Sequence, residues 1–267
     1  MTEFSYQSAC DWINNIEKIV PDFFRSYFDI HKIRYMNTFQ FHSQIIDSAN
    51  IDSVLDLGGS GLFTSLAHQA FSTSKSTVSG FTQDDRDLDS ADNLTFLDQY
   101  KKKHELITFD FDNPPSNAAD NSYDLIYCLE VIEHIAIDPA AFLRELLRIL
   151  KPDGLLMLST PNITSTASLE RLLNYQSPIG FPFFRTFRSS DRHNIEYTPN
   201  QLRHLIENSG FSIDKMATVN SWTSPSLAMQ NFMYHNGISS DMRGDDIFVL
   251  ATPSGLEPVE FPPEIYK

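Results

Sequence analysis

Two carboxylates and an imidazole that could hold a metal ion or move a proton stand together at Glu130, Glu133 and His134. They follow an apolar run around Cys128, so one turn after a strand would point all three side chains at a common place. Carboxylates with a neutral imidazole suit a divalent cation, and oxygen-rich ligand sets favour Mg²⁺ or Mn²⁺. Three ligands on one turn rarely complete a metal site, and a further imidazole is available at His193.

The same residues fit two roles that need no metal. His134 or His193 is then a general base that accepts the proton of an attacking hydroxyl. In a structural role, the acids and the imidazole pack at the strand end, cap a helix and border a bound ligand. The residues leave these three interpretations open.

A glycine turn at Asp56–Gly61 is the second feature with chemical potential, because it follows an apolar strand and precedes an amphipathic helix. Glycines tolerate positive φ and carry no Cβ, so the backbone there can approach a ligand closely. Strand, glycine turn and helix in this order build the ligand site of a doubly wound sheet. The turn lacks the glycine spacing and the following acid of dinucleotide sites, which disfavours an oxidoreductase.

The elements that must position these residues alternate between strand and helix after residue 50. This alternation predicts an α/β fold, a Rossmann-like, doubly wound and mostly parallel seven-stranded sheet. The expected parallel strands are Ser53–Leu57, Thr77–Phe81, Glu105–Phe109, Tyr123–Cys128 and Leu155–Ser159. The expected helices are Leu62–Phe71, Pro139–Leu150 and Pro199–Ser209, and the expected antiparallel edge is Phe211–Val219 with Ile247–Ala251.

Helical spacing of apolar residues and many aromatics predict an N-terminal helical cap over 1–50, before the α/β domain at 51–252. An insertion at 162–197, rich in aromatics, Pro and Arg, follows the fifth strand, where ligand-binding loops gather. The segment 253–267 is expected to be an extended tail.

The composition limits the partners and the compartment. The chain has 267 residues and a formal net charge of −15, which disfavours nucleic acid as a partner because phosphate backbones would be repelled. It has two cysteines, no basic and apolar leader, and no run long enough to cross a membrane. We therefore expect a protein of a reducing compartment, most simply the cytoplasm.

Five motifs carry a resemblance to a known enzyme family. They are the glycine turn Asp56–Gly61, then Asn121–Ile126, Glu130–His134, Arg148–Gly154 and Ser159–Asn162. Their order and spacing resemble the class I S-adenosylmethionine-dependent methyltransferases, including the type 11 and type 23 methyltransferase domains. The resemblance implies that 51–252 form a methyltransferase domain with S-adenosylmethionine as cofactor.

The resemblance also implies which residues bind the methionine part of the cofactor. They are Asp56, Gly58, Gly59 and Gly61, with Glu130 at the border of the site. The family's alternating glycines are compressed here to Asp-x-Gly-Gly-x-Gly, which changes the geometry expected of the turn.

For the rest of the cofactor, the resemblance implies an adenine near Asp110, whose carboxylate can accept from the exocyclic amine. Phe111 or Phe109 would pack on the adenine ring. The acid that usually ends the second strand and holds the ribose is replaced in this chain. Asp84 or Asp85 is expected to take over that role, unless the ribose is held otherwise.

The Glu-x-x-Glu-His stretch resembles that of metal-dependent small-RNA 2′-O-methyltransferases and of some quinone-pathway O-methyltransferases. Carried over by position, this resemblance implies Glu130, Glu133, His134 and His193 as metal ligands.

These features together predict an O-methyltransferase for a hydroxyl of a small-molecule, natural-product or sugar-like acceptor, assisted by a divalent cation. A cation or an imidazole addresses deprotonation of a hydroxyl, which favours oxygen over nitrogen. One alternative is a metal-dependent RNA 2′-O-methyltransferase, which the net charge disfavours. Another is a non-catalytic methyltransferase-like binding protein, whose altered glycine turn no longer holds the cofactor.

Overall fold

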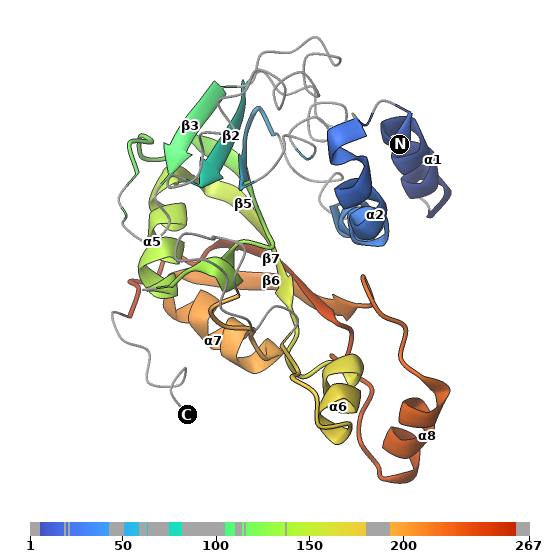
Figure 1. Cartoon of the computed structure of the whole chain (residues 1–267). Helices are drawn as coiled ribbons and strands as arrows, with labels where there is room; N and C mark the ends of the chain where they lie inside the picture. The colour runs from blue at the N-terminus through green and yellow to red at the C-terminus, as the bar shows by residue number, and fades with distance from the viewer. Residues whose placement is uncertain are drawn as a thin grey trace.

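The computed structural model describes residues 6–18, 20, 22–42, 51–58, 63, 75–81, 105–109, 114, 116–136, 138–179 and 193–259. The described strands form one seven-stranded sheet in the order β3-β2-β1-β4-β5-β7-β6 (Figure 1). They are β1 (Ser53–Leu57), β2 (Lys75–Phe81), β3 (Glu105–Phe109), β4 (Tyr123–Leu129), β5 (Leu150–Pro161), β6 (Phe211–Val219) and β7 (Asp246–Pro253). The first five strands pair in parallel, and β7 is antiparallel to both β5 and β6. The predicted doubly wound α/β fold is confirmed.

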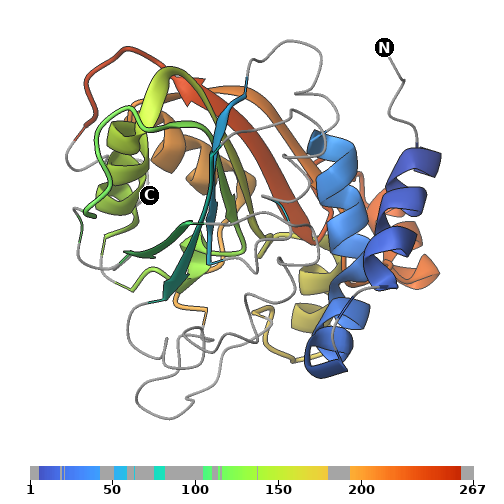
Figure 2. The ribbon, with the colours of Figure 1, turned by 90° about the horizontal axis from the view of Figure 1, so that it is seen from above.

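Helices cover both faces of this sheet, as Figure 2 shows from above. Helices α1 (Tyr6–Glu17) and α2 (Asp22–His42) pack on one face, and α5 (Pro139–Ile149) and α7 (Pro199–Asn208) pack on the other. Helices α6 (Thr166–Leu173) and α8 (Leu227–His235) lie beyond the end of the sheet (Figure 1), and a 3-10 turn η2 (Ile132–His134) follows β4. The predicted helices over α5 and α7 are present, whereas the helix predicted at 62–71 lies outside the described residues except for Phe63. Neither α6 nor α8 was predicted.

The strands are apolar on both sides because two separate cores flank them. Along β4, β5 and β7 the buried side chains alternate between the two cores. Ile126 of β4 and Leu158 of β5 pack with α5 and α7, whereas Tyr127 of β4 and Phe248 of β7 pack with α1 and α2. Strands buried on both faces give continuous apolar runs instead of strict alternation, which is the pattern seen in β4.

Local signals fix where the helices of the first core begin. Asp138 caps α5 by accepting a hydrogen bond of 2.9 Å from the Ala141 backbone, ahead of Pro139 in the first turn. Thr198 and Gln201 form a reciprocal capping box at the start of α7. These caps end the preceding loops close to the carboxyl end of the sheet.

The N-terminal helices share the second core with the sheet. Trp12 of α1 stacks on Phe39 of α2 at 5.2 Å between ring centroids. Phe41 of α2 in turn lies 5.6 Å from the ring of Phe248 in β7. These contacts join α1 and α2 to the sheet as one apolar cluster.

Within the described part of the chain, none of the helices has the length and apolar character needed to cross a membrane.

Because α2 belongs to the core of the sheet, truncating a buried α2 side chain should destabilise the whole domain. Phe28 is fully buried, and we expect Phe28→Ala to lower the free energy of unfolding by about 3–5 kcal/mol. Ile30 on the same helix is 65% exposed, and Ile30→Ala should stay within about 0.5 kcal/mol. Urea unfolding followed by circular dichroism and tryptophan fluorescence measures both. A separate early transition that alone responds to Phe28→Ala would instead show that residues 1–50 unfold as an independent cap.

Candidate active site

The carboxyl ends of β1 and β4 lie side by side, at the point where the strand order reverses. Leu57 pairs with Cys128, so the turn after β1 begins beside Glu130. Gly58 has a φ of 60°, and Glu130 has a φ of 58° although it carries a Cβ. The Glu130 N–H donates to the Ser159 carbonyl at 3.0 Å, which ties this strained residue to β5.

Glu133 is the most buried acid of the group predicted after β4. Its side chain is 0% exposed, and its Oε2 accepts a hydrogen bond of 2.9 Å from the Thr160 hydroxyl. Its Oε1 meets no hydrogen-bond donor among the described residues and lies 3.8 Å from Nε2 of His134. One carboxylate oxygen is therefore fixed by β5, and the other faces the imidazole.

Backbone hydrogen bonds bring His193 to the same place from the far end of the insertion. The N–H groups of Asn194 and Ile195 both donate to the Glu133 carbonyl, at 2.7 and 3.3 Å. The Asn194 side chain donates to the His134 carbonyl at 2.7 Å. The loop that carries His193 is thus attached to the turn that carries Glu133 and His134.

The two histidine rings meet edge to face, with centroids 5.0 Å apart. One ligand atom each of Glu133, His134 and His193 lies within 4.8 Å of the others, a separation that a single cation could bridge. Glu196 places its Oε1 2.8 Å from Nδ1 of His193. A carboxylate can only accept, so Nδ1 donates and Nε2 keeps the lone pair that a metal ligand or a general base needs.

Glu130, the fourth predicted metal ligand, is not part of this group of ligand atoms. Its Oε1 accepts a hydrogen bond of 2.6 Å from the Ser159 hydroxyl. It also interacts with the carboxyl group of Asp246 at the start of β7 and with the guanidinium of Arg34 from α2. The positive φ of Glu130 turns it toward a second set of charges over β5 and β7.

Burial dominates the electrostatics at this end of the sheet. It raises the pKa of Glu133 well above its usual value, and the neighbouring Glu130 carboxylate adds to the effect. Burial raises the pKa of Asp246 in the same way, again with a contribution from Glu130. The pKa of Glu130 rises less because Arg34 opposes the cost of burial.

Arg34 is the residue of this end that sequence analysis missed. It is 4% exposed, its Cζ lies 5.1 Å from the Tyr35 ring centroid, and its Nε–H meets no acceptor among the described residues. Burial opposes its charge, but Glu130 and Asp246 hold its pKa above the usual value, so it remains a cation. The sequence did contain one indication of this role. Arg34 lies on the buried face of α2, one helical turn before the buried Thr38.

The other predicted cofactor residues divide between described and undescribed parts of the chain. Asp56 is 1% exposed in β1, beside its β4 partner Tyr127, and Gly58 directly follows β1. The remaining predicted residues, Gly59, Gly61, Asp84, Asp110 and Phe111, lie outside the described residues.

Asn162 at the end of β5 joins the two ends of the insertion and binds the loop that contains Met242 and Gly244. Its amide donates to the carbonyls of Met242 and Gly244 at 3.0 and 2.8 Å, and its Oδ1 accepts from the Thr164 backbone and hydroxyl. It also forms a parallel bridge with Tyr197, so residues at both ends of the insertion are joined. Asn162 is therefore a structural turn residue that connects two loops, and it is only 2% exposed.

Comparison with known proteins assigns this arrangement to a family. The profile of a methyltransferase domain matches residues 11–215, about three quarters of the chain. The chain belongs to the methyltransferase-domain family. It is a class I S-adenosylmethionine-dependent methyltransferase, as the motifs from the glycine turn to Ser159–Asn162 predicted.

Curated relatives match shorter parts of this methyltransferase. The ubiquinone biosynthesis O-methyltransferase of Rickettsia bellii is 27% identical over 97 residues, 36% of this chain and 38% of the relative. A probable S-adenosylmethionine-dependent methyltransferase of Mycolicibacterium smegmatis is 33% identical over 96 residues, 36% of this chain and 31% of the relative. The chain thus aligns with well under half the length of these relatives.

Solved structures share the fold over most of the methyltransferase. A Haloferax volcanii methyltransferase, solved in complex with the Trm112 methyltransferase activator, superposes with a TM-score of 0.57 at 14% identity. That similarity covers 96% of this chain and 100% of the other. A methyltransferase from Archaeoglobus fulgidus gives 0.54 at 18% identity, over 87% and 100% of the two chains.

The residues at the carboxyl end fit the amino-acid part of S-adenosylmethionine. This part is a zwitterion, with a carboxylate and an ammonium on one carbon. The Nε–H of Arg34 meets no acceptor among the described residues, and Glu130 and Asp246 offer buried carboxyl groups beside it. A cationic donor and two carboxyl groups at one end of the sheet therefore complement the carboxylate and the ammonium of the ligand.

We expect substitution of Glu133 to change the pH dependence of stability of the metal-free protein. Because its pKa is raised on folding, the folded protein keeps a proton that the unfolded chain releases above the usual glutamate pKa of 4.5. Stability is then lost as the pH rises through the folded pKa. Glu133→Gln removes this titration, and the variant should gain about 1–3 kcal/mol over the wild type between about pH 5 and pH 8.

Chemical denaturation in the presence of a chelator, repeated across this pH range, measures the effect. Glu207→Gln on α7 is the matched control, since the Glu207 side chain is 44% exposed. Parallel pH profiles for the wild type and Glu133→Gln would contradict the buried, proton-binding state of Glu133.

Proposed function

We propose that this methyltransferase transfers the methyl group of S-adenosylmethionine to a hydroxyl of a small-molecule, natural-product or sugar-like acceptor, with a divalent cation held by Glu133, His134 and His193. The observation that carries the proposal concerns Oε1 of Glu133, a fully buried oxygen that meets no hydrogen-bond donor among the described residues and lies 3.8 Å from Nε2 of His134. A buried acceptor with no donor calls for an explanation, and a cation that two imidazoles also face supplies one.

Neighbouring side chains hold the proposed metal-binding residues in position before a cation or substrate binds. Thr160 fixes the rotation of the Glu133 carboxylate through its hydroxyl. Glu196 accepts a hydrogen bond from Nδ1 of His193 and so fixes the tautomer of the neutral imidazole. The lone pair of that ring is then on Nε2. A divalent cation bound here would lower the pKa of a nearby hydroxyl and orient it for attack on the sulfonium methyl.

The cofactor supplies an electrophilic methyl group on a sulfonium, and the chain supplies its orientation. We infer that Arg34 binds the carboxylate of the methionine part, because a guanidinium forms charge-assisted hydrogen bonds with a carboxylate. Glu130 and Asp246 would accept from the ammonium group. Orientation of both reactants at one end of the sheet makes the transfer effectively unimolecular.

The names of the curated relatives support oxygen as the accepting atom. Several are ubiquinone biosynthesis O-methyltransferases, matched over 17–36% of this chain. Glu133, His134 and His193 also bring carboxylate and imidazole groups together after β4, and we infer that the acceptor hydroxyl lies beside them. A hydroxyl acceptor that must lose a proton uses such groups.

The metal site predicts saturable binding of Mn²⁺ to the wild type. His193→Ala and Glu133→Gln should each weaken this binding at least about tenfold, since each removes a ligand. Electron paramagnetic resonance of free Mn²⁺ measures the affinity. His204→Ala on α7, a histidine outside the cluster, should bind Mn²⁺ as the wild type does. Equal affinities for all four proteins would overturn the metal site and leave His134 or His193 as a general base.

The cofactor site predicts micromolar binding of S-adenosylhomocysteine to the wild type, about −8 kcal/mol by calorimetry. Arg34→Met should weaken this binding about tenfold to a hundredfold, while affinity for methylthioadenosine, which has no amino-acid part, stays unchanged. Arg25→Met is the control, because Arg25 lies on the same helix but binds the carbonyls of Glu17 and Val20 at the N-terminal end of the chain. Its loss should leave the affinity for both ligands unchanged.

Comparing S-adenosylhomocysteine with methylthioadenosine distinguishes a failure of the whole cofactor site from a failure of the role proposed for Arg34. A folded wild type that binds neither ligand would sink the enzymatic proposal in favour of a non-catalytic binding protein. Equal losses for both ligands in Arg34→Met would show that the arginine only supports α2.

A further inference from the structure

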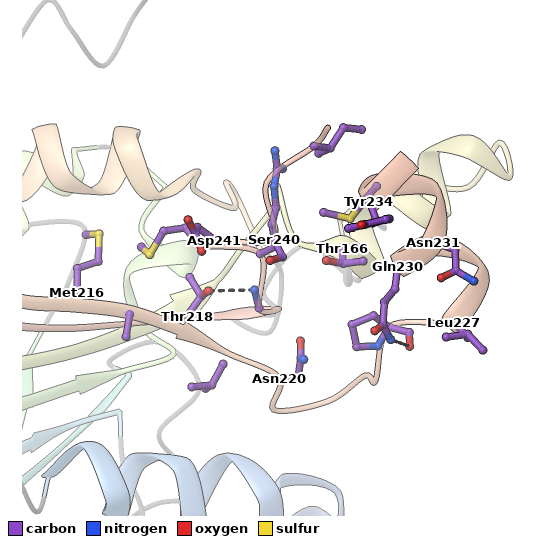
Figure 3. Close-up of a pocket in the computed structure, with 18 residues that line it drawn as sticks. Thr166, Met216, Thr218, Asn220, Leu227, Gln230, Asn231, Tyr234, Ser240 and Asp241 are labelled. Carbon is purple, nitrogen blue, oxygen red and sulfur yellow. Dashed lines mark hydrogen bonds between the residues drawn. The ribbon is translucent and has the colours of Figure 1, made fainter. Parts of the chain in front are cut away.

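A long connection between β6 and β7 forms an arm, residues 220–245, that contains α8 and lies beyond the sheet (Figure 1). A pocket of about 920 Å³ lies inside this arm, between the end of β6, helix α8 and the returning segment 238–244 (Figure 3). Its size is in the range of pockets that take small molecules. We call it the arm pocket.

Hydrogen bonds attach the walls of the arm pocket to the end of the sheet where the candidate active site lies. Asn162, at the end of β5, holds the carbonyls of Met242 and Gly244, which line the pocket. Ser221, next to the lining residue Asn220, donates to the Asp246 carboxylate at 2.8 Å. The pocket is therefore built on the residues that flank Glu130 and Arg34.

The lining of the arm pocket carries no net charge and exposes more apolar than polar surface. Three methionines, Met216, Met233 and Met242, contribute thioethers, and flexible thioether side chains adapt to ligands of varied shape. The lining contains one acid and one arginine, Asp241 and Arg243, whose charges cancel. Such a neutral lining stands out on a chain with a net charge of −15.

We propose that the arm pocket binds an uncharged, largely apolar substituent of the methyl acceptor, whose hydroxyl lies at the carboxyl end of β4. This inference rests on the proposed function, because it assigns the occupant to the acceptor. A charged substituent would lose its hydration without a matching charge in the pocket, whereas an apolar one gains from burial. The acceptor is then an amphipathic molecule with its reactive hydroxyl at one end.

The experiment uses N-phenylnaphthylamine, a neutral fluorescent probe, and its displacement by phenol and by octylphenol. We expect the wild type to bind one probe per chain, and octylphenol to displace it at least about tenfold more effectively than phenol. Ser240→Trp places a large side chain in the lining, as Ser240 borders the pocket in Figure 3. This variant should bind the probe at least about tenfold more weakly.

Ser224→Trp is the matched control, because Ser224 is an exposed serine of the same arm that does not line the pocket. It should behave as the wild type, and both variants should keep the wild-type affinity for S-adenosylhomocysteine. Absence of saturable probe binding, equal effects of the two tryptophans, or equal displacement by phenol and octylphenol would each overturn the arm-pocket proposal. Loss of S-adenosylhomocysteine binding in the wild type would instead show that the proposed function has failed.

Discussion

The reversal of strand order between β1 and β4 is the constraint on which the rest of this structure depends. Crossovers on either side of the reversal run in opposite directions, so the carboxyl ends of these two strands stay accessible to ligand groups. Gly58 after β1 and Glu130 after β4 both have positive φ. Glycine adopts this conformation without strain, whereas for Glu130 it is maintained only where the surroundings impose it. The fold supplies those surroundings by burying both faces of the sheet.

The same end of the sheet concentrates charge that the protein alone leaves incompletely matched. Among the described residues, Glu133 is buried with one oxygen that meets no donor, and Arg34 is buried with one donor that meets no acceptor. Burying unmatched polar groups costs free energy, which a domain of marginal stability can bear at only a few positions. Both groups lie near Glu130, whose carboxyl group interacts electrostatically with each of them. The free-energy cost is therefore concentrated at one end of the sheet.

The sequence predicted the sheet well because its strands carry local signals. The apolar runs of the strands and the apolar spacing of the helices over α5 and α7 are contiguous patterns, and these elements are present. The approach of His193 to Glu133 and His134 came from family resemblance, since hydrogen bonds between residues about 60 positions apart leave no local trace in the sequence. Arg34 was missed for a related reason: its burial depends on the packing of α2 against a distant part of the chain. Helix α8 was missed because its surface is largely exposed and its hydrophobic pattern is weak.

The bridge between Asn162 and Tyr197 makes the insertion a closed unit whose two stems meet at the sheet. Bonds from Asn194 and Ile195 to Glu133 then set the position of His193 from the stem itself. A change within the insertion that preserves both stems would therefore leave His193 in place beside Glu133. In evolutionary terms, the two stems are the part of the insertion whose sequence this geometry constrains.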